Sequence, residues 1–167
     1  MTEPRLLTML RTLRGAGVDF IVVGGIAAVL NGAAINTFDL DLVYARNEGN
    51  TEAILPVLDQ VEAFFRMQPE RRLKASASHL GSAGHLNLIT RYGPLDLLGT
   101  IGRNLGYEEL LPHSHEVEIG AGLSVLVLNL EKLIELKTEL GGDKDRAVLP
   151  MLRQTLIMRQ KTGDNAS

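Results

Sequence analysis

Two aspartates alternate with apolar residues in one segment of the chain, and a third aspartate stands among leucines further on. Asp39 and Asp41 belong to FDLDLVY at 38–44, and Asp96 belongs to GPLDLLG. The alternation over 38–44 predicts a β-strand, on which side chains two residues apart point to the same face. We therefore expect Asp39 and Asp41 to project together. The apolar residues that alternate with them are expected to point elsewhere, into apolar surroundings: Phe38, Leu40 and Leu42.

Neighbouring carboxylates repel each other, and each raises the pKa of the other unless a cation compensates. A hard divalent cation such as Mg²⁺ prefers oxygen ligands and keeps water positions that substrate phosphates can take. Asp96 is costly to bury unpaired in its apolar segment, and a metal ion held by Asp39 and Asp41 would give it a charged partner. For the pair alone, an edge strand with solvated acids is the alternative.

Paired glycines precede the acidic segment. Gly24 and Gly25 separate VDFIVV at 18–23, which predicts a strand, from IAAVLN at 26–31, which predicts a short buried helix. Glycines at such a turn let a phosphate approach the backbone, and a helix N-terminus offers N–H donors to it. A tight turn from strand to helix accounts for the same glycines. The chain contains neither a G-x-G-x-x-G fingerprint nor a G-K-[ST] phosphate loop.

Periodicity and turn residues predict the elements that must position these side chains. Strands are expected at 18–23, 38–44, 85–91, 94–98, 115–119 and 123–128. Helices are expected at 4–14, at 26–31, at 51–65 with Asn50 or Thr51 as N-cap, at 130–140, and from Asp143 onward. Pro150 is expected to kink that last helix or to begin a new one, residues 66–82 to form a loop, and the tail after Lys161 to fray.

This order of elements predicts an α/β fold, with a mixed β-sheet covered by helices and followed by C-terminal helices. We expect one domain over 1–167, with the sheet-containing core at about 1–128 and the C-terminal helices at about 129–161. The strands at 18–23, 38–44 and 94–98 must belong to one sheet, because only then can the three carboxylates meet.

Composition narrows the classes of function. The absence of cysteine excludes disulfides and thiolate zinc sites, and it agrees with the cytoplasmic location that we expect. A net charge of −3 and an aromatic content of 4% argue against a broad basic surface or a base-stacking platform for nucleic acid. No apolar run approaches the length of a membrane span, so no membrane partner is expected. For the local basic stretch of Arg66, Arg71, Arg72 and Lys74, a solvated loop is favoured over a phosphate contact.

The segment VVGGIAAVLNGAAINTFDLDLVY resembles the signature of the polymerase-β-type nucleotidyltransferases. That signature is an apolar strand, Gly-Gly or Gly-Ser, a short helix, and Thr-x-Asp-x-Asp on the next strand. Within the superfamily the chain looks closest to the minimal nucleotidyltransferases and the AbiE-like (AbiEii-type) toxins. Asp96 matches the third carboxylate, and LNLEKLIELKTELGGDKDRAVLPML is similar to the C-terminal helical motif of that branch. The resemblance spans roughly residues 18 to 155.

The resemblance implies a metal-dependent transfer of a nucleoside monophosphate from a nucleoside triphosphate, such as ATP, to an RNA, protein or small-molecule acceptor. Asp39 and Asp41 would bind two Mg²⁺ or Mn²⁺ ions, and Asp96 would bind the catalytic ion and help deprotonate the acceptor. The residues implied to bind the nucleotide or to steady the acidic strand are Gly24, Gly25, Thr37, Lys137, Lys144 and Asp145. The alternative for Lys137 is that its side chain extends to solvent. The alternative for Asp145 is that it only caps the helix that follows.

Two positions depart from the pattern of the branch. Ile35 stands where its members commonly carry arginine, and Val148 stands where many carry a second acid after Lys-Asp. An antitoxin partner is implied if the chain is the toxin of a toxin–antitoxin pair. A non-catalytic nucleotidyltransferase-fold protein that binds its partner without reacting is the alternative function.

Overall fold

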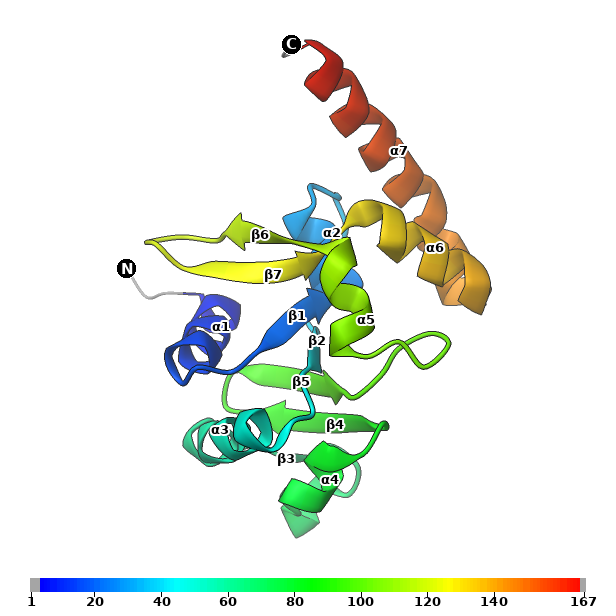
Figure 1. The fold of residues 1–167 in the computed structure, drawn as a ribbon. Helices are drawn as coiled ribbons and strands as arrows, with labels where there is room; N and C mark the ends of the chain where they lie inside the picture. Colours follow the sequence, from blue (N-terminus) through cyan, green and yellow to red (C-terminus); the bar gives the residue numbers. More distant parts are fainter. Residues whose placement is uncertain (1–3, 166–167) are drawn as a thin grey trace.

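The structure is a computed structural model and describes residues 4–165. Within these residues, the strands form one seven-stranded sheet in the order β3-β4-β5-β2-β1-β7-β6 (Figure 1). Their bounds are β1 Phe20–Val23, β2 Leu40–Tyr44, β3 Phe64–Phe65, β4 His85–Thr90, β5 Gly93–Leu98, β6 Ser114–Glu118 and β7 Ser124–Leu128. β2 pairs with β1 antiparallel and with β5 parallel, so the strands that carry the acidic and glycine motifs are neighbours. The predicted α/β fold and the common sheet are both confirmed.

The helices flank this sheet and end in two consecutive C-terminal helices. Their bounds are α1 Arg5–Gly15, α2 Gly24–Leu30, α3 Glu48–Gln60, α4 Ala77–Gly81, α5 Tyr107–Leu110, α6 Leu130–Leu140 and α7 Asp143–Asn165, with 3₁₀ turns at η1 Pro69–Arg71 and η2 Leu111–His113. α6 packs along α7, and α7 extends beyond the sheet toward its C-terminal end (Figure 1). No helix within residues 4–165 is both long and apolar enough to cross a bilayer.

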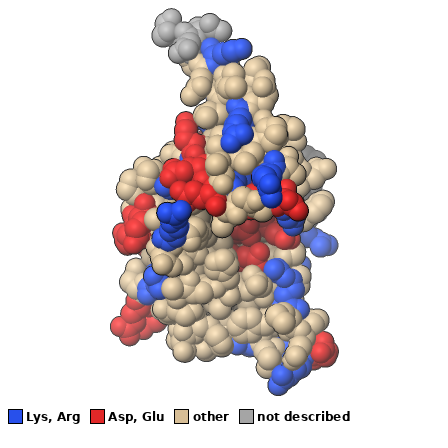
Figure 2. All heavy atoms as spheres, turned by 90° about the vertical axis from the view of Figure 1, so that its right-hand side faces the viewer, with Lys and Arg blue, Asp and Glu red and all other residues tan. Residues whose placement is uncertain are grey.

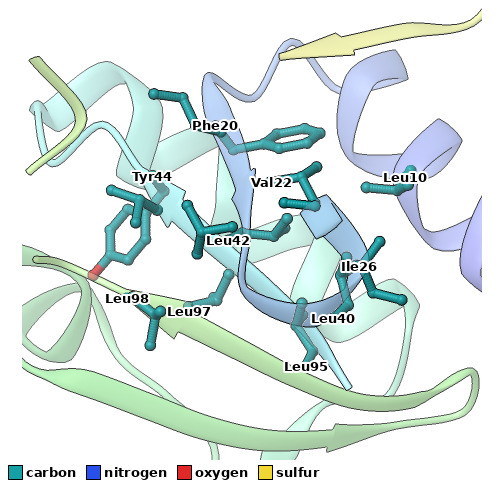
Figure 3. Packing of buried hydrophobic residues seen from close by; sticks show 14 of the residues in the cluster. Leu10, Phe20, Val22, Ile26, Leu40, Leu42, Tyr44, Leu95, Leu97 and Leu98 are labelled. Atoms are coloured by element: carbon teal, nitrogen blue, oxygen red, sulfur yellow. The ribbon is translucent and has the colours of Figure 1, made fainter. Parts of the chain in front are cut away.

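One face of the central strands is filled by apolar side chains. Alternation along β2 and β5 places Leu40, Leu42, Leu95 and Leu97 on this face, and Leu10 of α1 lies beside Val22 of β1 (Figure 3). Seven residues of this face that come from the three central strands are labelled in Figure 3, and all are buried: Phe20, Val22, Leu40, Leu42, Tyr44, Leu95 and Leu97. The Tyr44 hydroxyl donates to the backbone oxygen of Leu80 at 2.7 Å, which satisfies the polar end of a buried ring. The opposite face of β2 is therefore the one that presents Asp41.

Two polar side chains connect distant segments around the sheet. Asn50 accepts from the backbone N–H of Asp19 at 2.7 Å and donates to the backbone oxygens of Asp19 and Ala45. Asn31 donates to the backbone oxygen of Leu128, and its own side-chain oxygen accepts from Arg159 of α7 at 2.8 Å. Both asparagines are buried, so each joins its segments through contacts that water does not replace.

Several expected boundaries are wrong. The helix predicted at 51–65 is α3, which begins at Glu48 behind the N-cap Asn47; Asn50 does not cap it because its side chain is turned to the sheet. α3 ends at Gln60 because Glu62 adopts a left-handed backbone conformation, and the chain then forms the short strand β3. Residues 66–82 contain η1 and α4 rather than only loop.

Two further expectations concern Phe38 and α7. The Phe38 side chain is 84% exposed, because the strand begins at Leu40 and its alternation does not extend back to that residue. Pro150 lies inside α7 and does not begin a new helix, and α7 continues past Lys161 to Asn165 where a frayed tail was expected.

Candidate active site

The parallel pairing of β2 with β5 places Asp41 directly beside Asp96. Both side chains leave the sheet on the face opposite to the buried leucines, and the two carboxyl groups share a hydrogen bond. The pKa of Asp41 is raised from 3.8 to about 7, first by burial, and then by the hydrogen bond to Asp96 and the negative charges of Asp96 and Asp39. Two carboxyl groups that need a shared proton form a site in which a hard divalent cation can replace that proton.

Asp39 is the member of the predicted carboxylate set that stands apart. It lies one residue before β2 and is exposed, although its charge reaches Asp41. In the described part of the chain, no three acidic or histidine side chains form a group that could hold a metal ion as they stand. The donors that fit a hard cation are therefore Asp41 and Asp96 at the centre, with Asp39 at the rim.

Gly24 and Gly25 allow the turn between β1 and α2 to pack against the acidic segment. Gly24 has a φ of 67°, and a Cβ at this position would overlap the Asp41 carboxylate. A Cβ on Gly25 would lie 2.7 Å from the Oγ1 atom of Thr37. Both glycines are thus required by close packing, which also puts Thr37 against the turn and the start of α2 beside Asp41.

Arg66 is a member of this site that the sequence interpretation missed. Its guanidinium donates to Oδ1 of Asp96 at 2.8 Å and to the backbone oxygen of Leu88 at 3.1 Å. The side chains of Arg66 and Asp96 are 35% and 15% exposed, so this pair is better shielded than a surface ion pair. A solvated loop was expected for Arg66, and that expectation is wrong. Its position directly after the apolar pair Phe64–Phe65 was the only local signal.

α6 closes the site from above with Lys137. The lysine lines a cavity of about 130 Å³ together with Gly24 and Asp41, and its positive charge lowers the pKa of Asp41. The remaining wall of the cavity is apolar and comprises Val23, Leu98, Ile101, Leu133, Leu136 and Leu140, with Gly102. Lys137 therefore faces the carboxylates, and its side chain does not simply extend to solvent.

The two other predicted residues of the C-terminal motif, Lys144 and Asp145, have different environments in the structure. Asp145, in the first turn of α7, accepts from the Nζ atom of Lys137 at 3.3 Å, and both side chains are about one-fifth exposed. Lys144 is exposed on the same turn. Ile35 and Val148, at the positions that depart from the family pattern, are partly buried and pack against the hydrophobic core. The structure thus brings Lys137 and Asp145 to the site and leaves Lys144 on the surface.

Charges of both signs surround the carboxylates. Figure 2 looks onto the side of the molecule that lies at the right of Figure 1 and shows acidic atoms in a recess, with lysine or arginine side chains above and below. Around Asp41 and Asp96, the basic residues in contact or within electrostatic range are Arg66 and Lys137. Such an arrangement suits a ligand that carries phosphates together with a divalent cation.

Comparison with solved structures identifies the class of fold. The chain superimposes on the lincosamide antibiotic adenylyltransferase LnuA, solved with lincomycin bound, with a TM-score of 0.62 and 14% identity, covering 93% of this chain and 98% of that one. It is similar also to TM1012, a candidate nucleotidyltransferase from Thermotoga maritima, with a TM-score of 0.55 and 16% identity, covering 98% and 96% of the two chains. No family profile and no curated protein sequence matches the chain. The protein therefore has the nucleotidyltransferase fold, and its predicted closeness to the AbiE-like branch stays a prediction.

Proposed function

We propose that this protein is a divalent-cation-dependent nucleotidyltransferase that transfers a nucleoside monophosphate from a nucleoside triphosphate to a hydroxyl group of an acceptor. The observation that carries the proposal is the register of β2 and β5, which sets Asp96 beside Asp41, a residue that lines a cavity together with Lys137. The fold shared with LnuA supports the proposal, since that protein is an adenylyltransferase. The AbiE-like resemblance adds to the proposal a toxin role with an antitoxin partner, and the acceptor classes to be tested are RNA, protein and small molecules.

The residues have distinct roles in this proposal. Asp39, Asp41 and Asp96 would hold Mg²⁺ or Mn²⁺, which when bound neutralises phosphate charge in the transition state. Gly24 and Gly25 would leave room for the phosphates at the start of α2. Lys137 would donate to the triphosphate, and Asp145 would orient Lys137 through their ion pair.

The chemical step balances without a further reactant. The acceptor oxygen forms a bond to the α-phosphorus, and the bond between that phosphorus and the bridging oxygen breaks. Pyrophosphate leaves with the electron pair of the broken bond, and the acceptor's proton passes to the carboxylate of Asp96. The guanidinium of Arg66, which donates to Oδ1 of Asp96, would hold this carboxylate in place for the proton transfer.

Asp96→Ala tests the proposal. We expect the variant to keep measurable triphosphate binding and to lose transfer by at least about a hundredfold, the lower range for general-base catalysis. The assay incubates the protein with each labelled triphosphate, Mn²⁺ and acceptor pools of RNA, protein and small molecules. Asp96→Asn is the matched variant, because it keeps an acceptor for Arg66 and so separates loss of the carboxylate from disturbance of the fold.

A non-catalytic binding partner is the second candidate. It is favoured by the guanidinium of Arg66 on Asp96, which occupies one oxygen of a proposed metal ligand, and by Ile35 at the position of the family arginine. In that case the wild type shows no transfer with any triphosphate or acceptor, and Asp96→Ala binds its partner unchanged.

A further inference from the structure

A groove of about 300 Å³ lies beside the proposed active site, at the edge of the sheet that β3 and β4 form. Its apolar lining residues are Phe65, Met67 and Leu73, and its polar ones are Gln68, His85 and Asn87. The Met67 side chain is 80% exposed and that of Leu73 42%, although both are apolar. A concave, largely apolar surface with a few hydrogen-bonding groups has the character of a small-molecule site.

The strand register connects this groove with the carboxylates. β4 pairs antiparallel with β5, and Asn87 stands directly opposite Asp96. Side chains in directly opposed positions lie on the same face with their Cβ atoms about 5 Å apart. Asn87 is therefore both a wall of the groove and the cross-strand neighbour of Asp96, so a molecule in the groove can extend one group to Asp96.

The loop that forms the other wall is connected to the same carboxylate. The backbone N–H of Arg66 donates to the backbone oxygen of Asn87 at 2.9 Å, while its guanidinium donates to Asp96. Met67 follows directly in the chain and lines the groove. Arg66 thus fixes the position of the groove wall relative to the Asp96 carboxylate.

The charges near the groove distinguish between classes of acceptor. The cationic side chains of the segment each have an interaction within the protein: Arg66 with Asp96, Arg71 with Gln68, Arg72 with the ring of Phe64, and Lys74 with Asp59. An RNA acceptor would require cations turned toward its phosphates. The apolar lining and the volume favour a small organic molecule instead.

We propose that this groove is the acceptor subsite, and that it binds a small molecule with an apolar body and a hydroxyl group that reaches Asp96. The proposal rests on the proposed nucleotidyl transfer and assigns its acceptor class. The apolar body would lie against Met67 and Leu73, and the hydroxyl would receive the nucleoside monophosphate in the step described above.

The absence of cysteine from the chain permits a selective test. In the Met67→Cys variant the single thiol lies at an exposed groove position, and a bulky maleimide attached there fills the groove. Met158→Cys is the matched control, because Met158 is 53% exposed on α7, far along the chain from the groove segment. Each protein is incubated with labelled triphosphates, Mn²⁺ and, separately, total tRNA, a protein extract, and the small-molecule fraction of a cell extract. Thermal stabilisation by Mn²⁺ with nucleotide is measured in parallel.

We expect label in the small-molecule fraction, and at least a tenfold loss of it when the thiol of Met67→Cys is modified, measured against the same variant with its thiol free. Modification of Met158→Cys should cause no loss relative to unmodified Met158→Cys. Stabilisation by Mn²⁺ with nucleotide should persist in every case. Three results would overturn the acceptor subsite. The label enters tRNA or protein instead of a small molecule, no small molecule is labelled although nucleotide binds, or the labelling does not change when residue 67 is modified. Loss of nucleotide stabilisation in the wild type itself would overturn the proposed function, and the subsite with it.

Discussion

At the scale of single residues, Asp41 combines apolar surroundings with two acidic neighbours. Burial makes the largest contribution to its raised pKa, and the Asp96 carboxyl group, which shares a hydrogen bond with it, makes the next. In the folded protein without metal, the protonated form of Asp41 is therefore favoured at a pH below its pKa of about 7. A neutral amide of the same shape would avoid the cost of ionising this side chain.

Asp41→Asn is expected to change how stability depends on pH. The folded-state pKa of Asp41, about 7, lies above its ordinary value of 3.8, so its contribution to the free energy of unfolding is present below about pH 4 and is lost as the pH rises through 7. Without metal, the free energy of unfolding of the wild type should fall across this range by on the order of 2 kcal/mol relative to that of Asp41→Asn. This value is about half of what the full pKa shift implies, because the carboxyl group keeps some contact with water. Urea denaturation at a series of pH values measures the difference.

Added Mn²⁺ should stabilise the wild type above pH 7 and leave Asp41→Asn unchanged. Asp59→Asn serves as the control, since Asp59 is exposed in a surface pair with Lys74 and should show neither effect. Identical pH profiles for the wild type and Asp41→Asn would mean that Asp41 is a solvated surface acid.

Gly24→Ala tests the close approach of the turn to Asp41. The new Cβ would meet the Asp41 carboxylate and would also force alanine into the left-handed backbone region. Gly17→Ala is matched in backbone conformation, with a φ of 79°, but its Cβ would meet no atom within 4 Å. Gly17→Ala should cost about 1–2 kcal/mol of the free energy of unfolding, and Gly24→Ala clearly more. Equal losses in thermal or urea denaturation would show that Asp41 does not lie against Gly24.

At the scale of elements, Asn50 joins the start of α3 to the end of β2 and to the residue before β1. Its side chain makes three hydrogen bonds to backbone groups that are far from one another in the sequence. Because the residue is buried, its loss leaves the N–H of Asp19 and the oxygen of Ala45 without the partner that it supplies, whereas the oxygen of Asp19 still accepts from the N–H of Ala45.

We expect Asn50→Ala to lower the free energy of unfolding by about 2–4 kcal/mol. Asn47→Ala removes the single N-cap bond of the same helix and should cost about 1 kcal/mol. Urea denaturation of both variants checks the order. A larger loss for Asn47→Ala would assign the main anchoring role to the cap instead.

At the scale of the whole molecule, the C-terminal helices complete a site whose carboxylates lie on the sheet. α6 brings Lys137 over Asp41, and α7 holds Lys137 through Asp145. α7 is itself connected to the body of the protein through the contact of Arg159 with Asn31. Nucleotide binding should therefore depend on α6, while the carboxylates alone suffice for the metal ion.

Lys137→Met should weaken nucleotide binding about tenfold to a hundredfold, the loss expected for one charge-assisted hydrogen bond, and leave the affinity for Mn²⁺ alone nearly unchanged. Isothermal titration with nucleotide and with Mn²⁺ separates the two effects. Lys161→Met, an exposed position far along α7, is the control, and Lys144→Met tests whether the exposed neighbour contributes. Unchanged nucleotide affinity in Lys137→Met would show that this lysine only extends to solvent.

The sequence alone was enough to predict the acidic strand, the glycine turn before it, the two strands β4 and β5, and α6. These features follow from local periodicity and turn residues, which act over a few neighbouring positions. Alternation on one strand was also enough to predict that Asp41 leaves the sheet opposite to Leu40 and Leu42. It failed at Phe38, because periodicity does not show where a strand begins.

Only the tertiary structure decided what meets Asp41 and Asp96. The two aspartates are 55 positions apart in the chain, and they meet only because of the register between β2 and β5. Arg66, which follows β3, reaches Asp96 from a further segment. Asn50 likewise serves the sheet rather than the cap that its local sequence suggested, because its buried side chain forms hydrogen bonds with the backbone of Asp19 and Ala45. Such pairings are set by the packing of distant segments and the need to satisfy buried polar groups, which no local pattern of residue types records.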